Sequence, residues 1–444
     1  MHEILIKAAQ LVLSLSLLVI IHEFGHFIFA RIFKTRVEKF YLFFNPWFSL
    51  WKKKIGETEY GIGWLPLGGY VAISGMVDES MNTEALKEEP KPWEFRSKNK
   101  WQRLLIMIGG VLFNFILAFI IYIGVLFAWG SSYLPTSSLT HGISVNAEAQ
   151  SMGFENGDKI ISVDGKELEN FGNFLPTIAI DGATQVEIER EGSMLSIPIT
   201  SEHINGLING KMSFTPRMFC NFSVGAVATE SAAEKAGLLA GDVFVGLDSL
   251  HFTFYDEFSN YLLSHANQDV VLLVNRGGKE LQLPSTVSAE GKLGFQPQFS
   301  SEAYSYLKYN TKEYSLLEAI PAGLDMGASK IGSYINQLKL FFKPETKAYE
   351  SLGGFISIGN IFPSAWDWHM FWTMTAFLSI ILGVMNLLPI PALDGGHVMF
   401  LLYEIITGRK PGDKFLEYAQ TAGMILLLIL VVYANGNDIL RLFK

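Results

Sequence analysis

An apolar stretch from about Ile4 to Phe33 is long enough to enter a bilayer, and it contains the sequence His22-Glu23-Phe-Gly-His26. On a helix the two histidines are four residues apart and project from one face, so both imidazoles can bind one metal ion. Glu23 lies beside them and can activate a water molecule. Ionisable side chains at this depth cost at least ~2.5 kcal/mol each, and a bound metal ion compensates for that cost. The motif therefore predicts a membrane helix that holds a metal ion.

The composition indicates both a membrane part and a soluble part. Of 444 residues, 49% are hydrophobic and only 17% are charged, with a mean hydropathy of +0.27. We expect a polytopic α-helical membrane protein with four transmembrane helices, at residues 1–33, 104–129, 369–402 and 416–438. The net charge of −9, without a long basic run, argues against nucleic acid as a partner. The single cysteine, Cys220, excludes intrachain disulfides and multi-cysteine metal sites.

Basic residues predict the orientation of these segments. Such residues cluster after the first segment (Arg31, Lys34, Arg36, Lys39, Lys52, Lys53 and Lys54) and after the third (Arg409, Lys410 and Lys414). Because loops rich in lysine and arginine stay on the cytoplasmic side, residues 34–103 and 403–415 should face the cytoplasm. The large region between the second and third segments is then extracytoplasmic.

This topology predicts where a third metal ligand lies. The first and third segments run in the same direction, so the end of the third should lie at the depth of the histidine motif. The sequence there is Asn386-Leu-Leu-Pro389-Ile-Pro391-Ala-Leu-Asp394-Gly-Gly-His397. Two prolines break a helix, which membranes tolerate only where the backbone is buried in protein or lines a wet cavity.

The carboxylate of Asp394 is the ligand that we favour. It would complete a set of two histidines and one aspartate and leave the fourth tetrahedral position open, as a catalytic zinc site requires. His397 is an alternative ligand. The sequence Asp394-Gly-Gly could also form only a turn after the helix.

Two parts of the extracytoplasmic region are similar to each other. Residues 152–165 match residues 236–249, and the stretch 211–216 matches 292–297. A unit of roughly 80 residues with short strands and Gly-Asp turns is therefore present twice. We expect two tandem PDZ domains, α+β folds with a partly open β-barrel, at residues 130–217 and 218–300. PDZ domains add an extended peptide to a sheet edge, but the pair could also only block access sterically.

Three further segments border the membrane part. Within residues 301–368, apolar residues recur every three or four positions from Leu316 to Phe342, which predicts an amphipathic helical stretch bent near Pro321. Residues 60–74 alternate strand-favouring residues with glycines, including Gly63, Gly68 and Gly69, and predict a re-entrant hairpin or loop whose edge could pair with substrate. In the second segment, Gly109, Gly110 and Asn114 predict close helix packing.

With these motifs, nearly the whole chain resembles the bacterial site-2 proteases, a family of intramembrane zinc metalloproteases. The resemblance rests on the His22-Glu23-x-x-His26 helix, the stretch from Asn386 to Asp394, the glycine-rich loop before the second segment and the paired PDZ domains. It implies one zinc ion held by His22, His26 and Asp394, with Glu23 as the acid-base catalyst. Asn386 matches a residue near the family's active site, and Pro389 and Pro391 belong to the same motif.

The resemblance also implies a setting and substrates. The chain should lie in a bacterial inner membrane, with its PDZ domains in the periplasm and its active site toward the cytoplasm. Its substrates should be single-span membrane proteins, notably an anti-sigma factor already cut outside the membrane during envelope stress, and remnant signal peptides. The PDZ pair would then act as a size-exclusion filter. The second repeat has Leu293-Gly294-Phe295, whereas the first has Met212-Ser213-Phe214, which argues against carboxylate capture by the first.

Two other classes of protein fit part of this pattern. A non-catalytic membrane receptor would use the PDZ pair for recognition and the histidines for a structural zinc site. Another membrane metalloenzyme, such as a prenyl-protein protease, would also carry the histidine motif, but it would not need an extracytoplasmic PDZ pair.

Overall fold

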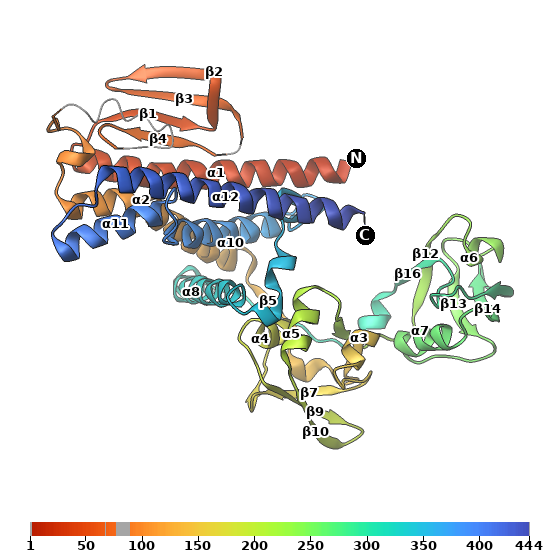
Figure 1. Cartoon of the computed structure of the whole chain (residues 1–444). Coiled ribbons are helices and arrows are strands. Elements are labelled where there is room, and N and C mark those ends of the chain that lie inside the picture. Colours follow the sequence, from red (N-terminus) through yellow and green to blue (C-terminus); the bar gives the residue numbers. More distant parts are fainter. Residues whose placement is uncertain (1, 67, 77–88, 444) are drawn as a thin grey trace. The chain divides into compact units, whose positions relative to one another are not determined.

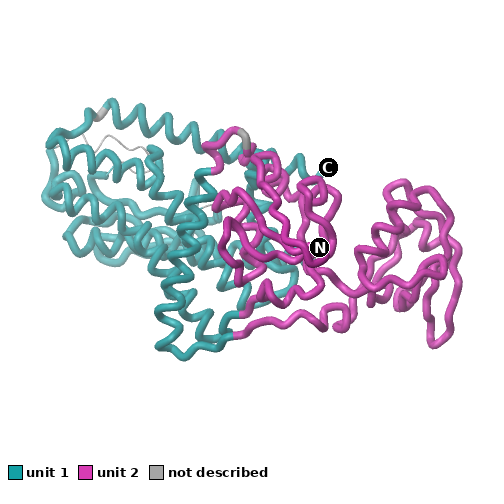
Figure 2. Tube along the Cα trace, turned by 90° about the horizontal axis from the view of Figure 1, so that it is seen from below, with its two compact units in different colours: residues 1–131, 312–339, 349–444 teal, residues 132–311, 340–348 magenta. Residues whose placement is uncertain are grey.

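The structure is a computed structural model that describes residues 2–66, 68–76 and 89–443. Leu67, in the predicted loop 60–74, and residues 77–88, in the predicted region 34–103, lie outside the described residues. The chain forms two compact units, which Figure 2 distinguishes by colour. Unit 1 comprises residues 1–131, 312–339 and 349–444, and unit 2 comprises residues 132–311 and 340–348.

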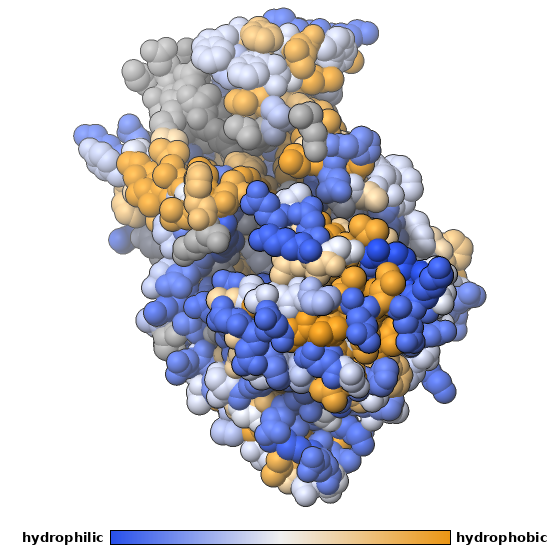
Figure 3. Space-filling model, turned by 90° about the vertical axis from the view of Figure 1, so that its right-hand side faces the viewer, coloured by the Kyte–Doolittle hydropathy of each residue, from blue (hydrophilic) through white to orange (hydrophobic). Residues whose placement is uncertain are grey.

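Four helices of unit 1, among the described residues, are long and apolar enough to cross a membrane. They lie side by side in Figure 1: α1 (His2–Ile32), α2 (Lys100–Trp129), α10 (Trp368–Leu387) and α12 (Asp413–Leu442). Side chains such as Leu428 and Val432 of α12 are about two-thirds exposed, as expected of a surface that faces lipid. Hydrophobic residues also gather in patches on the face that Figure 3 shows. The prediction of four membrane helices is confirmed.

Two predicted boundaries are wrong. Residues 369–402 are not one helix, because α10 ends at Leu387 and a separate helix, α11 (Asp394–Thr407), follows the two prolines. The predicted loop 403–415 is also too long: α11 continues to Thr407, and α12 begins at Asp413. Ile405, beyond the predicted end, is partly buried and packs against a hydrophobic cluster that contains Leu104 and Met107 of α2, so packing carries α11 beyond residue 402.

Small residues allow α1 and α2 to approach closely. A Cβ atom added to Gly25 would lie 2.2 Å from the carbonyl oxygen of Gly109, so the two backbones are in contact there. The start of α2 is fixed by a capping box, in which Asn99 accepts from the N–H of Gln102 and the Gln102 side chain accepts from the N–H of Asn99.

A four-stranded sheet packs on the C-terminal half of α1. Its strands are β1 (Val37–Leu42), β2 (Phe44–Ile55), β3 (Thr58–Leu65) and β4 (Tyr70–Ile73), in the order β2-β3-β1-β4. The predicted hairpin at residues 60–74 is wrong, because β1 lies between β3 and β4: β1 pairs in parallel with β3 and antiparallel with β4. The sequence did not predict β1, because this short strand closely follows the long apolar helix α1.

The predicted amphipathic stretch is a continuous helix, α8 (Leu316–Leu340), with Pro321 inside it. It is seen nearly end-on in Figure 1, so it crosses the four membrane helices at a steep angle. Added Cβ atoms on Gly323 and Gly327 would lie 2.6 Å from Ile123 and 2.4 Å from Phe119 of α2, so α8 packs on α2 through a small-xxx-small pair. A short helix, α9 (Phe355–Gly359), follows and precedes α10.

Unit 2 contains the two repeats, and each has its own hydrophobic core. The first repeat consists of β6 (Ile143–Val145), α3 (Ala147–Gln150), β7 (Lys159–Val163), β8 (Lys166–Glu167), α4 (Phe174–Ala179), β9 (Gln185–Arg190), β10 (Ser193–Pro198), α5 (Ser201–Ile208) and β11 (Phe214–Pro216). The second consists of β12 (Phe222–Val227), α6 (Ala232–Lys235), β13 (Val243–Leu247), α7 (Tyr255–Ser264), β14 (Asp269–Arg276), β15 (Lys279–Thr286) and β16 (Phe295–Phe299). Two short strands, β5 (Ser131–Tyr133) and β17 (Asn310–Lys312), pair with each other.

The sheets of the repeats are small. Their orders are β10-β9-β7-β8 and β11-β6 in the first repeat, and β15-β14-β13-β12-β16 in the second. No sheet among the described residues closes on itself, so neither the tandem PDZ pair nor the partly open β-barrel expected of it is confirmed.

The two repeats share one polar network. In the first, Arg190 Nε donates to Asp158 Oδ1 (2.7 Å) and Nη2 donates to the Gly153 carbonyl. In the second, Arg276 Nε donates to Asp242 Oδ1 (2.6 Å) and Nη2 to the Gly237 carbonyl. Each aspartate follows a glycine at a turn with positive φ, +96° at Gly157 and +91° at Gly241, which explains the recurrent Gly-Asp pair.

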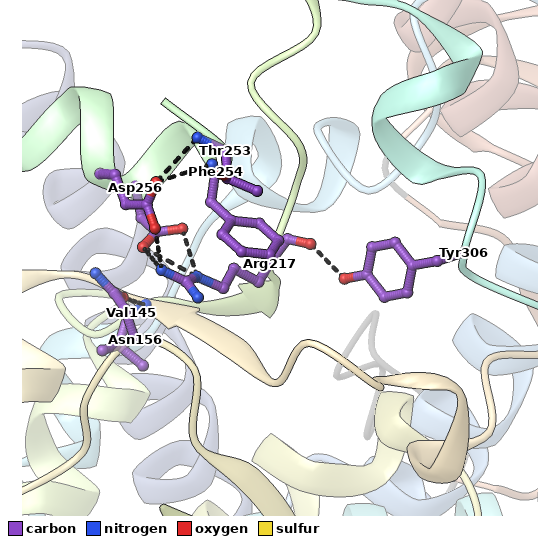
Figure 4. Close-up of polar contacts among 8 residues, drawn as sticks. Val145, Asn156, Arg217, Thr253, Phe254, Asp256 and Tyr306 are labelled. Carbon is purple, nitrogen blue, oxygen red and sulfur yellow. Dashed lines mark hydrogen bonds and ion pairs between the residues drawn. The ribbon is translucent and has the colours of Figure 1, made fainter. Parts of the chain in front are cut away.

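Arg217 lies where the repeats meet (Figure 4). Its guanidinium donates to both carboxylate oxygens of Asp256 at 3.0–3.1 Å and lies 3.9 Å from the ring centroid of Phe254. The Tyr306 hydroxyl donates to the Arg217 carbonyl. Burial raises the pKa of Tyr306 to about 12, so this hydroxyl remains a donor at physiological pH.

Candidate metal centre

Three side chains from distant parts of the chain meet inside unit 1. His22 Nε2 lies 3.2 Å from Asp394 Oδ2, and His26 Nε2 lies 3.3 Å from the same oxygen. The two Nε2 atoms are 3.3 Å apart. Ligands bound to zinc at about 2.0–2.1 Å in tetrahedral geometry are separated by about 3.3 Å. The triangle therefore has the dimensions of one face of a zinc tetrahedron.

The donor set also fits a cation chemically. Both imidazoles are buried, and apart from the two Nε2 atoms no described residue offers the buried Asp394 Oδ2 a hydrogen-bond donor. A buried carboxylate oxygen without a partner is costly, and a metal ion between the three atoms would remove that cost. These residues are the only set of three or more potential ligands that the described part of the chain brings within 4.8 Å.

Helix α2 packs directly against the imidazoles of His22 and His26. A Cβ atom at Gly110 would lie 2.4 Å from His26 Nε2 and 2.7 Å from His22 Cε1. Only glycine leaves room there for both rings. The sequence predicted Gly110 as a packing residue, and its neighbours prove to be the histidines themselves.

The loop between α10 and α11 positions the carboxylate. It contains Pro389 and Pro391 and ends where Asp394 begins α11. Ala392 has φ of +83°, a conformation that costs a residue other than glycine of order 1–3 kcal/mol and that is concentrated at functional sites. A Cβ atom on Gly395 would lie 2.1 Å from the Leu388 carbonyl oxygen, so this glycine allows α11 to start directly against the loop.

Glu23 and Asn386 lie beside the three ligands. The Glu23 carboxylate accepts a hydrogen bond from the backbone N–H of Val71, in β4. Asn386 is in the last turn of α10, with its Nδ2 3.4 Å from His22 Nε2. His397, the alternative ligand, is one turn beyond Asp394 and is not part of the group of three.

The glycines of the predicted loop 60–74 serve packing. An added Cβ atom would meet the Phe44 carbonyl at 2.1 Å for Gly63, the Phe44 ring at 2.8 Å for Gly68, and the Tyr41 carbonyl at 2.6 Å for Gly69. Gly69 also lies against Val19 of α1. Gly69 therefore lets the start of β4 lie close to α1, whereas Gly63 and Gly68 make room for Phe44.

Two polar groups near the site were not predicted as functional. The Ile106 carbonyl lies 2.8 Å from His26 Nδ1, and the Asn114 amide lies 3.0 Å from His22 Nδ1. For Asn114, the sequence did contain a signal: a polar amide in the middle of the uncharged segment 104–129, four residues after Gly110. The Ile106 carbonyl belongs to the backbone, so no residue type in the sequence could indicate its role.

A helix of membrane length that carries two histidines and a glutamate, brought together with an aspartate from a second helix, has the donor set typical of a membrane metalloprotease. Comparison with known proteins agrees with this class. The model of Peptidase family M50 matches residues 10–430, and the chain belongs to this family of zinc-dependent proteases.

Relatives match along their full length. The chain is 29% identical to the regulator of sigma-E protease RseP of Salmonella typhimurium and covers 100% of both sequences. It is 29% identical to the regulator of sigma E protease of Haemophilus influenzae, over 97% of this chain and 98% of that protein. A Vibrio cholerae protein whose name places it among the zinc metalloproteases is 28% identical over 100% of both. Membership of a peptidase family favours the enzyme over the receptor alternative.

Proposed function

We propose that this zinc metalloprotease cleaves the membrane-spanning segments of single-span proteins. The observation that carries the proposal is the location of the site: His22, Glu23 and His26 are on α1, a helix of membrane length, and Asp394 meets them from α11. A peptide bond that reaches this site must come from within the bilayer or enter it.

His22, His26 and Asp394 would hold the zinc ion. When bound, zinc supplies a Lewis acid that polarises the scissile carbonyl and lowers the pKa of water toward ~7. Glu23 would take a proton from the attacking water and then deliver it to the leaving nitrogen. Asn386, whose amide nitrogen lies beside His22 Nε2, would donate a hydrogen bond to the substrate.

A substrate helix must unwind before it can be cut, because its carbonyls are engaged in internal hydrogen bonds. An unpaired backbone group in lipid costs several kcal/mol, so the enzyme must offer replacement partners. Among the described residues, the sheet order leaves one edge of β4 without a partner strand, and Val71 of β4 contacts Glu23. We infer that an extended substrate pairs with this edge and passes the catalytic carboxylate.

The names of the relatives suggest a physiological context. Two of them are named regulator of sigma-E protease, so we propose an anti-sigma factor trimmed outside the membrane as a substrate, together with remnant signal peptides. The basic residues that follow α1 and α11 support a cytoplasmic active site in a bacterial inner membrane. The matching networks of the two repeats support a duplicated unit, and we propose that this unit is a tandem PDZ pair in the periplasm that excludes bulky substrates.

Glu23→Gln is the most direct test of the mechanism. The amide keeps the shape of the side chain but cannot accept the proton, so we expect zinc to remain bound and cleavage of a reconstituted single-span substrate to fall by at least about 100-fold. Zinc content is measured on the same preparation. Retained turnover would remove Glu23 from the mechanism, and faster cleavage of substrates with helix-breaking residues would support unwinding.

A further inference from the structure

Asn114 is a buried amide at the metal centre with one half unpaired. Its side chain is 0% exposed and its Nδ2 faces His22 Nδ1 at 3.0 Å. Its Oδ1 has no hydrogen-bond partner among the residues that the structure describes. The residue lies on α2, four positions after Gly110 and therefore on the face that supports both imidazoles.

The orientation of the Asn114 amide depends on which ring nitrogen of His22 carries the proton. If Nδ2 donates to Nδ1, then Nδ1 carries a lone pair and the neutral ring holds its proton on Nε2. That nitrogen faces Asp394, and with a proton it cannot bind a metal ion. A half-turn of the amide, which changes its shape little, places Oδ1 against Nδ1 instead. Nδ1–H then donates to Oδ1, and Nε2 is free.

The second histidine already has this arrangement. His26 Nδ1 lies 2.8 Å from the Ile106 carbonyl, which can only accept, so its proton is on Nδ1 and Nε2 faces the site. Ile106, Gly110 and Asn114 are spaced by four residues along α2. One helix face therefore supplies an acceptor for each ring and a glycine between them.

We propose that Asn114 is a positioning residue: its Oδ1 accepts the Nδ1 proton of His22 and so selects the tautomer and ring orientation that bind zinc. This inference rests on the metal site proposed above. Partners of this kind typically contribute 10–100-fold to metal affinity, because they fix the ligand before the ion arrives.

The test measures zinc affinity of the full-length protein in detergent by competition with a chelating dye. Asn114→Leu retains bulk and removes the acceptor, and we expect zinc to bind 10–100-fold more weakly. Asn114→Asp restores an acceptor and should recover most of that loss. Ser379→Ala is the matched control, because Ser379 Oγ donates to the Asn114 backbone carbonyl at 2.7 Å and does not involve the amide. It should leave zinc affinity within about twofold of the wild type.

The outcomes separate this inference from the proposed site. If Asp394→Ala abolishes zinc binding while Asn114→Leu leaves it unchanged, Asn114 only packs the helices and the inference is wrong. Equal losses in Asn114→Leu, Asn114→Asp and Ser379→Ala would also overturn it, because they would indicate a general packing defect. If Asp394→Ala binds zinc as tightly as the wild type, the site itself is wrong. Should Asn114→Leu not fold, Asn114→Ala replaces it.

Discussion

At the scale of single residues, the candidate metal centre depends on the absence of a side chain at Gly110 of α2. Three ligand atoms at 3.2–3.3 Å need space beneath two imidazole rings, and the absent side chain at Gly110 provides it. The histidine motif could be recognised in the sequence because its spacing matches one helical turn. Gly110 and Asn114 could be predicted only as packing residues, because nothing in a sequence says which helix faces which.

Gly110→Ala should therefore disable the metal centre. The added methyl group would lie 2.4 Å from His26 Nε2, so the rings must move and we expect zinc affinity to fall by at least about tenfold. Gly124→Ala, on the same helix, is the control, because its Cβ would have no neighbour within 4 Å in the part of the chain that the structure describes. Zinc content after dialysis against a buffered zinc concentration distinguishes the two variants. Equal zinc binding by both would show that the imidazoles do not need the space at Gly110.

At the scale of elements, the position of α11 is decided by contacts at both of its ends. Asp394 starts the helix at the metal centre, and Glu404 in its last turn accepts from Arg103 of α2 at 2.6 Å. Lys100 donates to the Ile405 carbonyl beside this ion pair. The prolines indicated that the third segment is interrupted, but the sequence pattern continued the segment to residue 402. A ligand that is brought back by a separate helix depends on such tertiary contacts.

Glu404→Gln should destabilise unit 1 by about 3–5 kcal/mol, because it leaves the buried Arg103 charge without a counter-ion. The midpoint of thermal unfolding in detergent measures the effect, and the double variant Arg103→Leu/Glu404→Leu should recover most of the loss. Glu189→Gln is the control: it breaks the exposed Lys159–Glu189 pair and should cost below about 1 kcal/mol. A small effect at Glu404 would mean that α11 is held by other contacts.

The hydrogen bonds between Arg276 and Asp242 should make the stability of the second repeat depend on pH. Hydrogen bonds from Arg276 hold the pKa of Asp242 below its ordinary value of 3.8. A carboxyl group whose pKa is lowered by folding stabilises the folded state above its unfolded pKa, and this contribution is lost as the pH falls further. We expect hydrogen exchange of residues 222–299 to accelerate as the pH is lowered below about 3.8, after correction for the intrinsic exchange rate.

Asp242→Asn isolates this effect. The variant should exchange faster than the wild type at pH 5 and approach it as the pH falls below 3.8, because the amide has no proton to gain. A constant difference between the two proteins across this range would show that Asp242 does not carry the pH dependence.

At the scale of the whole molecule, the metal centre belongs to one unit alone. Its proposed ligands come from α1 and α11, both in unit 1, whereas the repeats form unit 2 with separate cores. A ligand that binds only the folded state stabilises it according to its concentration and affinity. The two units should therefore respond differently when the metal ion is removed.

Chelation should destabilise unit 1 and leave unit 2 unchanged. With zinc initially at about 100 times its dissociation constant, its removal costs about 2.7 kcal/mol. Hydrogen exchange of the full-length protein, followed separately for α1 and for the strands of the second repeat, measures both responses with and without chelator. Equal acceleration in both units would indicate that they unfold together.

The sequence by itself determined the helices of membrane length, the pair of histidines with Glu23 and the internal repeat, and it favoured Asp394 over His397 as the third ligand. These features depend on periodicity, spacing and composition, which are local properties of a chain. Only the tertiary structure decided that β1 separates β3 from β4, that α11 is a helix of its own, and that α2 supports both imidazoles. Each of these depends on which surfaces meet across hundreds of residues, and packing between distant elements is not written in the local pattern of either one.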